Sequence, residues 1–189
     1  MTFPGPRPDA SEPEPADSKG VLMLTDFTAN SPDLGWYVQN DNVMGGRSEG
    51  GFETEEKGEL IFAGSTNTNG GGFSSIRTQP VQLDLSKYDG IQLRVKGDGR
   101  RYTWELQTTA RYRNFRVSYW ADFNTLKGEW STVRIPFASF YPQFRGFKLD
   151  GPELDTSEIR EFGLYIYDKL DGPFELRLAS VQAYTEKAP

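Results

Sequence analysis

Alternation of apolar and polar residues with a period of two is the feature that most constrains this fold. It is clearest in five segments of the 189-residue chain, 90–96, 101–108, 115–120, 162–167 and 174–178. In the first of them, Ile91, Leu93 and Val95 face one way and the polar residues between them face the other. This pattern is typical of antiparallel strands with one buried face.

Weaker strand patterns and clear turn signals occupy most of the remaining chain. Turns are marked by Asp-Gly, Lys-Gly and Gly-Asp-Gly sequences, in which Gly supplies a positive φ and Asp bonds loop amides. The weaker strands are expected over residues 21–27, 50–53, 59–64, 73–78, 81–85 and 130–135. About ten short strands at this spacing predict an all-β jelly-roll sandwich of antiparallel strands.

Helices are expected to be at most one turn long. No segment carries a period of about 3.6 residues over several turns. Single turns are expected over residues 85–89 and 155–159, where Ser86 and Thr156 can act as N-caps.

The sequence divides into a leader, one domain and a short tail. Residues 1–19 hold five prolines, four acids and almost no large apolar residues, which predicts a disordered leader. The jelly-roll domain is expected over residues 20–184, followed by a tail at 185–189. This length suffices to bury a core without disulfides or a structural metal, and a monomer is expected.

Composition removes several classes of chemistry. The chain has no cysteine and no histidine, which excludes disulfides, thiol nucleophiles, thiolate metal sites and Ser-His-Asp catalysis. Carboxylates, Lys, Tyr and oxygen-ligated metals remain. The sequence shows no signal peptide and no apolar run of about 18 residues, which predicts a soluble protein without a membrane span, cytoplasmic if the N-terminus is native.

Three glycine-rich strings stand out in order along the chain. They are NDNVMGGRS at 40–48, NGGGFSSIR at 69–77 and GDGRRY at 97–102. Together with WYVQNDNVMGGRSEGGF, GEWSTVRIPFASFYPQFRG and FGLYIYDKLDGPFELRLASVQAY, they resemble the complex I intermediate-associated protein 30 family. The resemblance covers residues 27–184; it departs at Asn42, where Gly is more usual, and at an extra Thr–Asn pair before the second glycine run.

That resemblance implies a fold and a kind of function. The fold is a galactose-binding-like jelly roll, similar to that of several carbohydrate-binding modules. Eukaryotic members of the family are assembly factors for mitochondrial respiratory complex I, and related domains in photosynthetic organisms are linked to RNA and photosystem biogenesis. The expected function is therefore binding that aids assembly of a larger protein complex, without catalysis.

The first candidate site is formed by the glycine-rich loops at one end of the sandwich. Its residues are Asp41, Asn42, Ser48, Asn69 and Arg77. They predict either a polar loop cluster that receives a ligand or partner, or a loop pair bonded to itself, with Asp41 capping amides or paired with Arg77. In either case a buried Asp41 is expected to be sensitive to substitution.

The second candidate site is the outward face of the central strands. Its residues are Gln92, Arg94, Glu105, Gln107, Arg116, Trp120, Tyr165 and Tyr167. Aromatic rings beside planar hydrogen-bonding groups suit sugars, because rings stack on C–H faces while amides and guanidinium groups bind hydroxyls. The alternative is that these aromatics pack beneath a loop or against a second layer.

A basic stretch with interleaved aromatic residues runs from Arg94 to Arg116. It suits a phosphate-bearing or RNA ligand, or it consists of solvated hairpin charges that balance an acidic surface. The net charge of −6 disfavours nucleic acid, and we expect none as a partner.

The sequence thus predicts a non-enzymatic assembly domain with a protein partner. One alternative is a carbohydrate-binding module that uses the aromatic-polar sheet face, with a glycan as partner. A second is a glycan-active enzyme that uses a pair of carboxylates. No cofactor is expected; a structural Ca²⁺ at the strand ends, with Asp26 as its candidate ligand, rests on composition alone.

Overall fold

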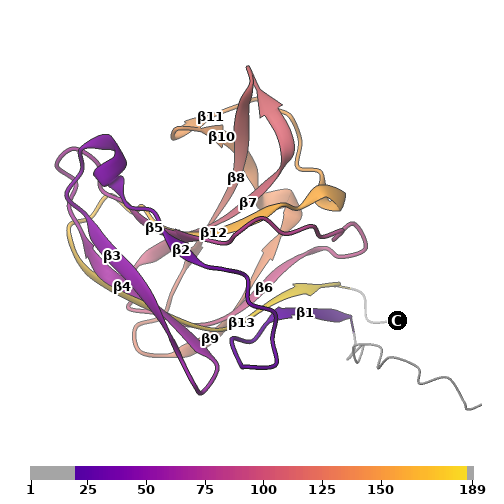
Figure 1. Cartoon of the computed structure of the whole chain (residues 1–189), viewed down its shortest axis with the longest axis horizontal. Helices are drawn as coiled ribbons and strands as arrows, with labels where there is room; N and C mark the ends of the chain where they lie inside the picture. Colours follow the sequence, from indigo (N-terminus) through magenta and orange to yellow (C-terminus); the bar gives the residue numbers. More distant parts are fainter. Residues whose placement is uncertain (1–19, 187–189) are drawn as a thin grey trace, which may run out of the picture.

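The computed structural model describes residues 20–186 and shows two antiparallel sheets that enclose one core (Figure 1). The all-β sandwich predicted from the alternation is confirmed. The predicted leader at 1–19, and residues 187–189 of the predicted tail, lie outside the described residues. Among residues 20–186, no helix is long and apolar enough to cross a membrane.

The first sheet has the strand order β3-β4-β13-β6-β9, and β1 also pairs with β13. Its strands are β1 (Val21–Thr25), β3 (Glu49–Glu55), β4 (Glu59–Thr66), β6 (Gly90–Lys96), β9 (Trp130–Pro136) and β13 (Gly172–Tyr184). The two ends of the described chain meet in this sheet, since Val21 lies opposite Tyr184.

The second sheet has the order β11-β10-β8-β7-β12-β5-β2. Its strands are β2 (Tyr37–Val38), β5 (Ser74–Arg77), β7 (Arg101–Tyr112), β8 (Phe115–Asn124), β10 (Tyr141–Phe144), β11 (Phe147–Lys148) and β12 (Glu161–Ile166). The β7–β8 hairpin and the β10–β11 hairpin rise together at the top of Figure 1.

The alternating residues of the two sheets meet in the core as predicted. Ile91, Leu93 and Val95 of β6 are fully buried, as are Trp104 and Leu106 of β7. Strand β7 differs from the simple pattern, because the polar residues between its core residues are also buried. A second layer of side chains therefore covers the outer face of the seven-stranded sheet.

Some elements differ from the expectation. Residues 81–85 form no strand, because their amides bond to the loop at 156–160 and a single bridge joins Leu83 to Ile159. The turn expected at 85–89 is not helical, and η3 (Thr156–Glu158) is a short 3-10 helix capped by Asp155 instead of Thr156. Two further 3-10 turns, η1 (Asp41–Met44) and η2 (Phe137–Ser139), were not expected.

Candidate functional site

A groove of about 500 Å³ lies on the outer face of the seven-stranded sheet. Its floor comes from β5, β7, β8 and β12. One wall comes from β2, η1 and the glycine-rich segment at 71–73, and the other from the β10–β11 hairpin. The volume lies in the range of about 300–1,000 Å³ that is usual for small-ligand sites.

Strand register brings the floor residues together. On β7, Glu105 lies opposite Trp120 of β8 and Gly163 of β12. Arg77 of β5 lies opposite the same Gly163. A Cβ atom added at position 163 would lie 3.0 Å from the Cβ atom of Glu105 and 3.2 Å from the Tyr165 ring. The glycine therefore leaves room for the side chains of Glu105 and Tyr165.

Glu105 is the centre of a buried hydrogen-bonded cluster. Its carboxylate accepts hydrogen bonds from Trp120 Nε1 at 2.6 Å and from Gln107 Nε2 at 3.1 Å. Arg77 Nε lies 4.0 Å from Oε1 of this carboxylate, which is 1% exposed. Arg77 also donates to the Tyr165 hydroxyl, and its guanidinium carbon lies 5.3 Å from the Tyr165 ring centroid. We call these five residues the Glu105 cluster.

The cluster perturbs the ionisable groups within it. Burial raises the pKa of the Tyr165 hydroxyl, and the Glu105 carboxylate adds to this. Although burial opposes the charge of Arg77, the Glu105 carboxylate holds the pKa of its guanidinium above the ordinary value. Tyr165 is therefore a neutral hydroxyl and Arg77 a permanent cation.

A second carboxylate, Glu161, lies beside the cluster. It faces Gln107 across the strand pair, and its Oε2 atom is 3.7 Å from Arg116 Nη1. Burial raises the pKa of Glu161, with a further contribution from Glu105, and this outweighs the lowering by Arg77 and Arg116. The groove floor thus holds two carboxylates and two guanidinium groups.

Aromatic rings line the groove on the side of the glycine-rich loops. The Trp120 ring centroid lies 5.1 Å from that of Tyr165 and 6.0 Å from that of Tyr167. The ring centroid of Phe73 lies 6.0 Å from that of Tyr165 and 6.3 Å from that of Tyr167. Tyr165 is buried, whereas Trp120, Tyr167 and Phe73 are half-buried and present ring surface to the groove.

Asp41 holds together the loops that form one groove wall. Its fully buried carboxylate accepts bonds from Ser48 N at 2.9 Å, Ser48 Oγ at 2.6 Å, Gly72 N at 2.6 Å and Phe73 N at 3.3 Å. Burial raises the pKa of Asp41, but these hydrogen bonds outweigh it and leave the pKa below its ordinary value. Asp41 therefore caps amides, which is one of its two predicted roles. The other prediction, an ion pair with Arg77, is wrong, because Arg77 contacts Tyr165 and Glu105 of the Glu105 cluster instead.

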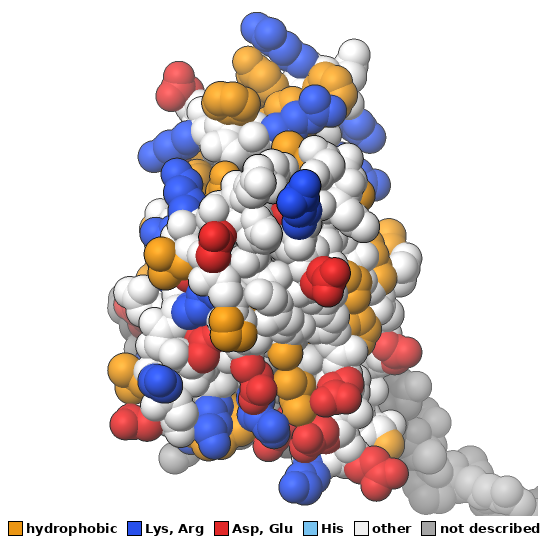
Figure 2. Space-filling model, turned by 90° about the vertical axis from the view of Figure 1, so that its left-hand side faces the viewer, with side chains coloured by type: hydrophobic (Ala, Val, Ile, Leu, Met, Phe, Trp, Pro, Cys, Tyr) orange, Lys and Arg blue, Asp and Glu red, His pale blue; other side chains and the backbone are white. Residues whose placement is uncertain are grey.

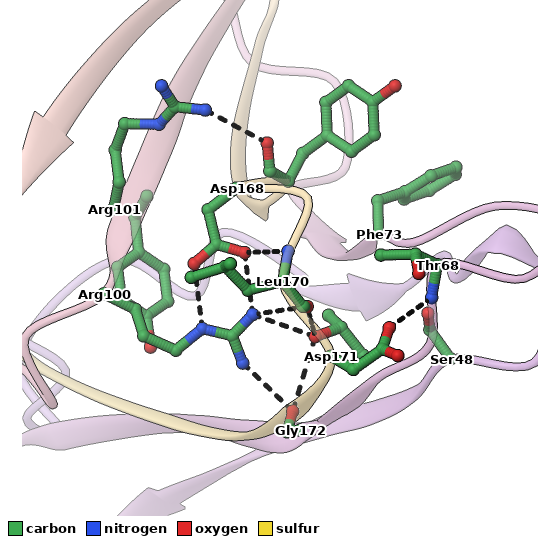
Figure 3. A network of polar contacts seen from close by, with 12 residues as sticks. Ser48, Thr68, Phe73, Arg100, Arg101, Asp168, Leu170, Asp171 and Gly172 are labelled. Carbon is green, nitrogen blue, oxygen red and sulfur yellow. Dashed lines mark hydrogen bonds and ion pairs between the residues drawn. The ribbon is translucent and has the colours of Figure 1, made fainter.

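The third glycine-rich string anchors the loop that follows β12 (Figure 3). Arg100 binds both carboxylate oxygens of Asp168, at 2.7 and 2.9 Å, and donates to the carbonyls of Leu170 and Gly172. In the same loop, Asp171 accepts from the amide of Thr68 at 2.7 Å. This network ties the segment after Tyr167 to the glycine-rich wall and so positions the groove rim.

The structure brings together seven of the predicted site residues and separates the others. Arg77, Glu105, Gln107, Arg116, Trp120, Tyr165 and Tyr167 all line the groove. Asp41 and Ser48 are buried beneath its wall, and Asn42 and Asn69 are exposed on the loops.

Two residues assigned to the same face lie elsewhere. Gln92 and Arg94 belong to β6 in the six-stranded sheet. There the guanidinium carbon of Arg94 lies 5.7 Å from the ring centroid of Trp130. The prediction that they share the face of Glu105 is therefore wrong, because alternation defines two faces of a strand but does not assign the strand to a sheet.

Other groove residues were missed by sequence reasoning. Glu161 continues the alternation of Tyr165 and Tyr167 backwards along β12, and this signal could have identified it. Tyr37 and Gln143 come from short strands that carry no alternation of their own.

The basic stretch is dispersed in the structure. Arg94 lies on the other sheet and Arg100 is committed to Asp168, whereas Arg111, Arg113 and Arg116 cluster near the end of the β7–β8 hairpin. Figure 2 shows basic side chains at both ends of the molecule, with hydrophobic ones beside them at the upper end and acidic ones mostly in the lower half.

Asp26 accepts hydrogen bonds from Thr28 and Ser31 within its own turn. The hydrogen bonds from Ser31 and Thr28 lower the pKa of its carboxyl. Within residues 20–186, no group of three or more Asp, Glu, His or Cys side chains is placed to hold a metal ion. The structure thus gives Asp26 a role in turn geometry.

A family model described as complex I intermediate-associated protein 30 (CIA30) matches residues 25–178. The chain belongs to this family. An uncharacterized protein of Schizosaccharomyces pombe, C9E9.15, is 31% identical over 193 residues, covering 89% of this chain and 86% of that protein. Mitochondrial complex I intermediate-associated protein 30 of Mus musculus is 25% identical over 174 residues, and that of Drosophila melanogaster 26% over 176.

These CIA30 relatives are longer than the match. The alignments cover 81% and 80% of this chain but 53% of the mouse protein and 60% of the fly protein. The family shared by these proteins is therefore defined on the jelly-roll domain, and the mouse and fly chains extend beyond it.

Solved structures confirm the jelly-roll fold. The family 11 carbohydrate-binding module of Clostridium thermocellum, in complex with a beta-1,3-1,4-mixed-linked tetrasaccharide, has a TM-score of 0.66 and 16% identity, covering 92% of this chain and all of that one. A family 30 carbohydrate-binding module has a TM-score of 0.58 and 16% identity, covering 88% and 99%. At this identity the likeness establishes the fold alone.

Proposed function

We propose that this CIA30-family chain is a non-enzymatic binding domain that aids the assembly of a larger protein complex, and that it binds through the groove on the seven-stranded sheet. The observation that carries the proposal is the groove itself, whose floor is held in place by the buried Glu105 cluster. A rigid, polar and aromatic concavity of this kind loses little entropy when a partner enters.

Membership of the family supports the assembly role. The mouse and fly relatives bear the name complex I intermediate-associated protein 30. The groove lies on the domain that those proteins share with this chain, so a common binding face would account for what they have in common.

The chemistry of the floor supports binding over catalysis. Both oxygens of Glu105 accept hydrogen bonds, from Trp120 and from Gln107. Carboxylate-based hydrolysis needs two carboxyl groups that reach the reacting bond. Of the two carboxylates in the groove floor, Glu161 alone has an oxygen without a hydrogen-bond partner. The chain also has no histidine or cysteine to act in its place.

A capture experiment with matched variants tests the proposal. Full-length chain is expressed with an affinity tag in its native host, cross-linked and purified as wild type, as Tyr167→Ala and as Trp130→Ala. Both are half-buried aromatic residues, but Trp130 starts β9 on the six-stranded sheet. We expect subunits of one protein complex with the wild type and Trp130→Ala, and their loss with Tyr167→Ala.

Two outcomes would count against the proposal. Capture of no protein partner by the wild type would remove the assembly role. Equal loss with both variants would show that the groove has no special part in binding, provided that thermal unfolding shows both variants to be folded.

A further inference from the structure

Among the residues that the structure describes, two buried side-chain atoms in the groove floor have no hydrogen-bond partner. They are Arg77 Nε and Glu161 Oε1, and both are buried. The other two such atoms, Trp104 Nε1 and the Tyr184 hydroxyl, belong to residues that do not line the groove. A buried polar group without a hydrogen bond is destabilising, so a ligand that bonds to both atoms is favoured.

The two atoms lie on neighbouring strands and differ in chemistry. Arg77 is opposite Gly163, two residues along β12 from Glu161, so both side chains project from the same face at diagonal positions. Arg77 Nε is a donor, and Glu161 Oε1 is an acceptor when ionised. A hydroxyl group both accepts and donates, so a ligand with several hydroxyls can satisfy both.

The charges of the floor favour an uncharged ligand. The guanidinium groups of Arg77 and Arg116 are offset by the carboxylates of Glu105 and Glu161 at short distances. An anion entering the groove would face two carboxylates, and a cation would face two guanidinium groups. The floor itself therefore favours neither an anion nor a cation. One further guanidinium, that of Arg145 on the β10–β11 wall, lies over the rings of Phe115 and Phe144, 5.9 and 5.2 Å from their centroids.

The groove wall adds apolar surface of a suitable shape. The half-buried rings of Trp120 and Tyr167 meet at 70°, so they form a corner beside the polar floor. The C–H face of a sugar ring packs on an aromatic ring while its hydroxyl groups remain free to hydrogen-bond. Polar floor and aromatic corner together match a molecule that has hydroxyl edges and apolar faces.

We propose that the groove binds a neutral saccharide, with a sugar ring against Trp120 or Tyr167 and hydroxyl groups on Arg77 and Glu161. This rests on the proposed function in one respect, that the groove is the binding site. It adds the ligand class, which is a neutral oligosaccharide, free or carried by a partner.

Calorimetric titration of the full chain tests the ligand class. The probes are a beta-1,3-1,4-mixed-linked glucan tetrasaccharide, neutral mannan and galactan tetrasaccharides, and one sulfated galactan tetrasaccharide. We expect at least one neutral probe to bind with an affinity that does not change with salt, because no net charge is neutralised. The sulfated probe is expected to bind no better than its neutral counterpart.

Variants locate the binding on the groove. Tyr167→Ala and Glu161→Gln are each expected to weaken binding by about tenfold or more, equivalent to about 1.4 kcal/mol. Tyr167→Phe keeps the ring and is expected to retain binding, and Trp130→Ala is the control on the other sheet. Thermal unfolding of each variant separates loss of binding from loss of fold.

The outcomes distinguish this inference from the proposed function. If no neutral probe binds, but capture of a protein partner still depends on Tyr167, the ligand class is wrong and the groove keeps its function. Binding of the sulfated probe alone, weakened by salt, would overturn the neutral character. Binding that survives both Tyr167→Ala and Glu161→Gln would overturn the assignment of the site.

Discussion

Replacing Asp41 by Asn removes one charge from the wall of the groove while keeping the size of the side chain. The carboxylate accepts four hydrogen bonds, two from Ser48 and one each from the amides of Gly72 and Phe73. Three of them converge on Oδ2 and one on Oδ1. The single amide oxygen of Asn can replace one of these two atoms, and its NH₂ group then faces a donor.

The size of the effect follows from that arrangement. In the best orientation, the Asn oxygen keeps the three bonds at Oδ2, and Ser48 N is left unsatisfied at a cost of about 1–3 kcal/mol. The three retained hydrogen bonds change from charged to neutral, which lowers the contribution of each to stability by about 1 kcal/mol. Allowing for local relaxation, we expect Asp41→Asn to lower the free energy of unfolding by about 3–5 kcal/mol, comparable to breaking a buried ion pair.

The effect should depend on pH in one direction. The pKa of Asp41 in the folded protein lies below the ordinary value of 3.8. The stability that its ionised form contributes is therefore complete above the unfolded pKa and is lost as the pH falls through the folded pKa. The difference between wild type and Asp41→Asn should be constant near neutral pH and shrink in acid.

Urea unfolding followed by tryptophan fluorescence measures this difference at neutral and acidic pH. Asp84→Asn is the matched control, because the exposed Asp84 makes similar bonds, to the amide and hydroxyl of Ser86, and should change stability little. A loss below about 1 kcal/mol for Asp41→Asn, within the range of a single neutral hydrogen bond, would refute the reasoning. So would a difference that grows in acid.

Two further predictions concern the loops that support the groove. Arg100→Ala leaves the buried Asp168 carboxylate without its cation and should cost about 3–5 kcal/mol in urea unfolding; a variant as stable as wild type would contradict the anchoring role. At Gly46, an added Cβ would lie 2.2 Å from the Asp41 carboxyl carbon, so Gly46→Ala should lower the thermal midpoint clearly. Gly51→Ala, where a Cβ meets nothing within 4 Å, should leave the midpoint unchanged or raised, and equal effects at both positions would contradict the close approach.

The sandwich could be predicted from the sequence because burial and alternation coincide along its long strands. Strands β6, β7, β12 and β13 each present a continuous apolar face to the core. Strands β2, β10 and β11 are two to four residues long and are defined by the neighbours that they pair with. A period of two cannot be recognised over so few residues.

The groove could be predicted only in part, for a related reason. Alternation placed Glu105 and Gln107 on the face away from the core, and the structure puts Trp120 beside them. It could not exclude Arg94, because the assignment of a strand to one sheet depends on contacts far along the chain. The bonds of Asp41 to Gly72 and Phe73 span more than thirty residues and leave no local signal.

The central claim is that the groove is the binding face, and site-specific photo-cross-linking tests it most directly. A photoreactive aromatic residue replaces Trp120 in one full-length variant and Trp130 in another, and each is irradiated in the native host. Our account predicts a discrete adduct from position 120 that position 130 does not give. The same adducts from both positions, or an adduct from position 130 alone, would contradict it.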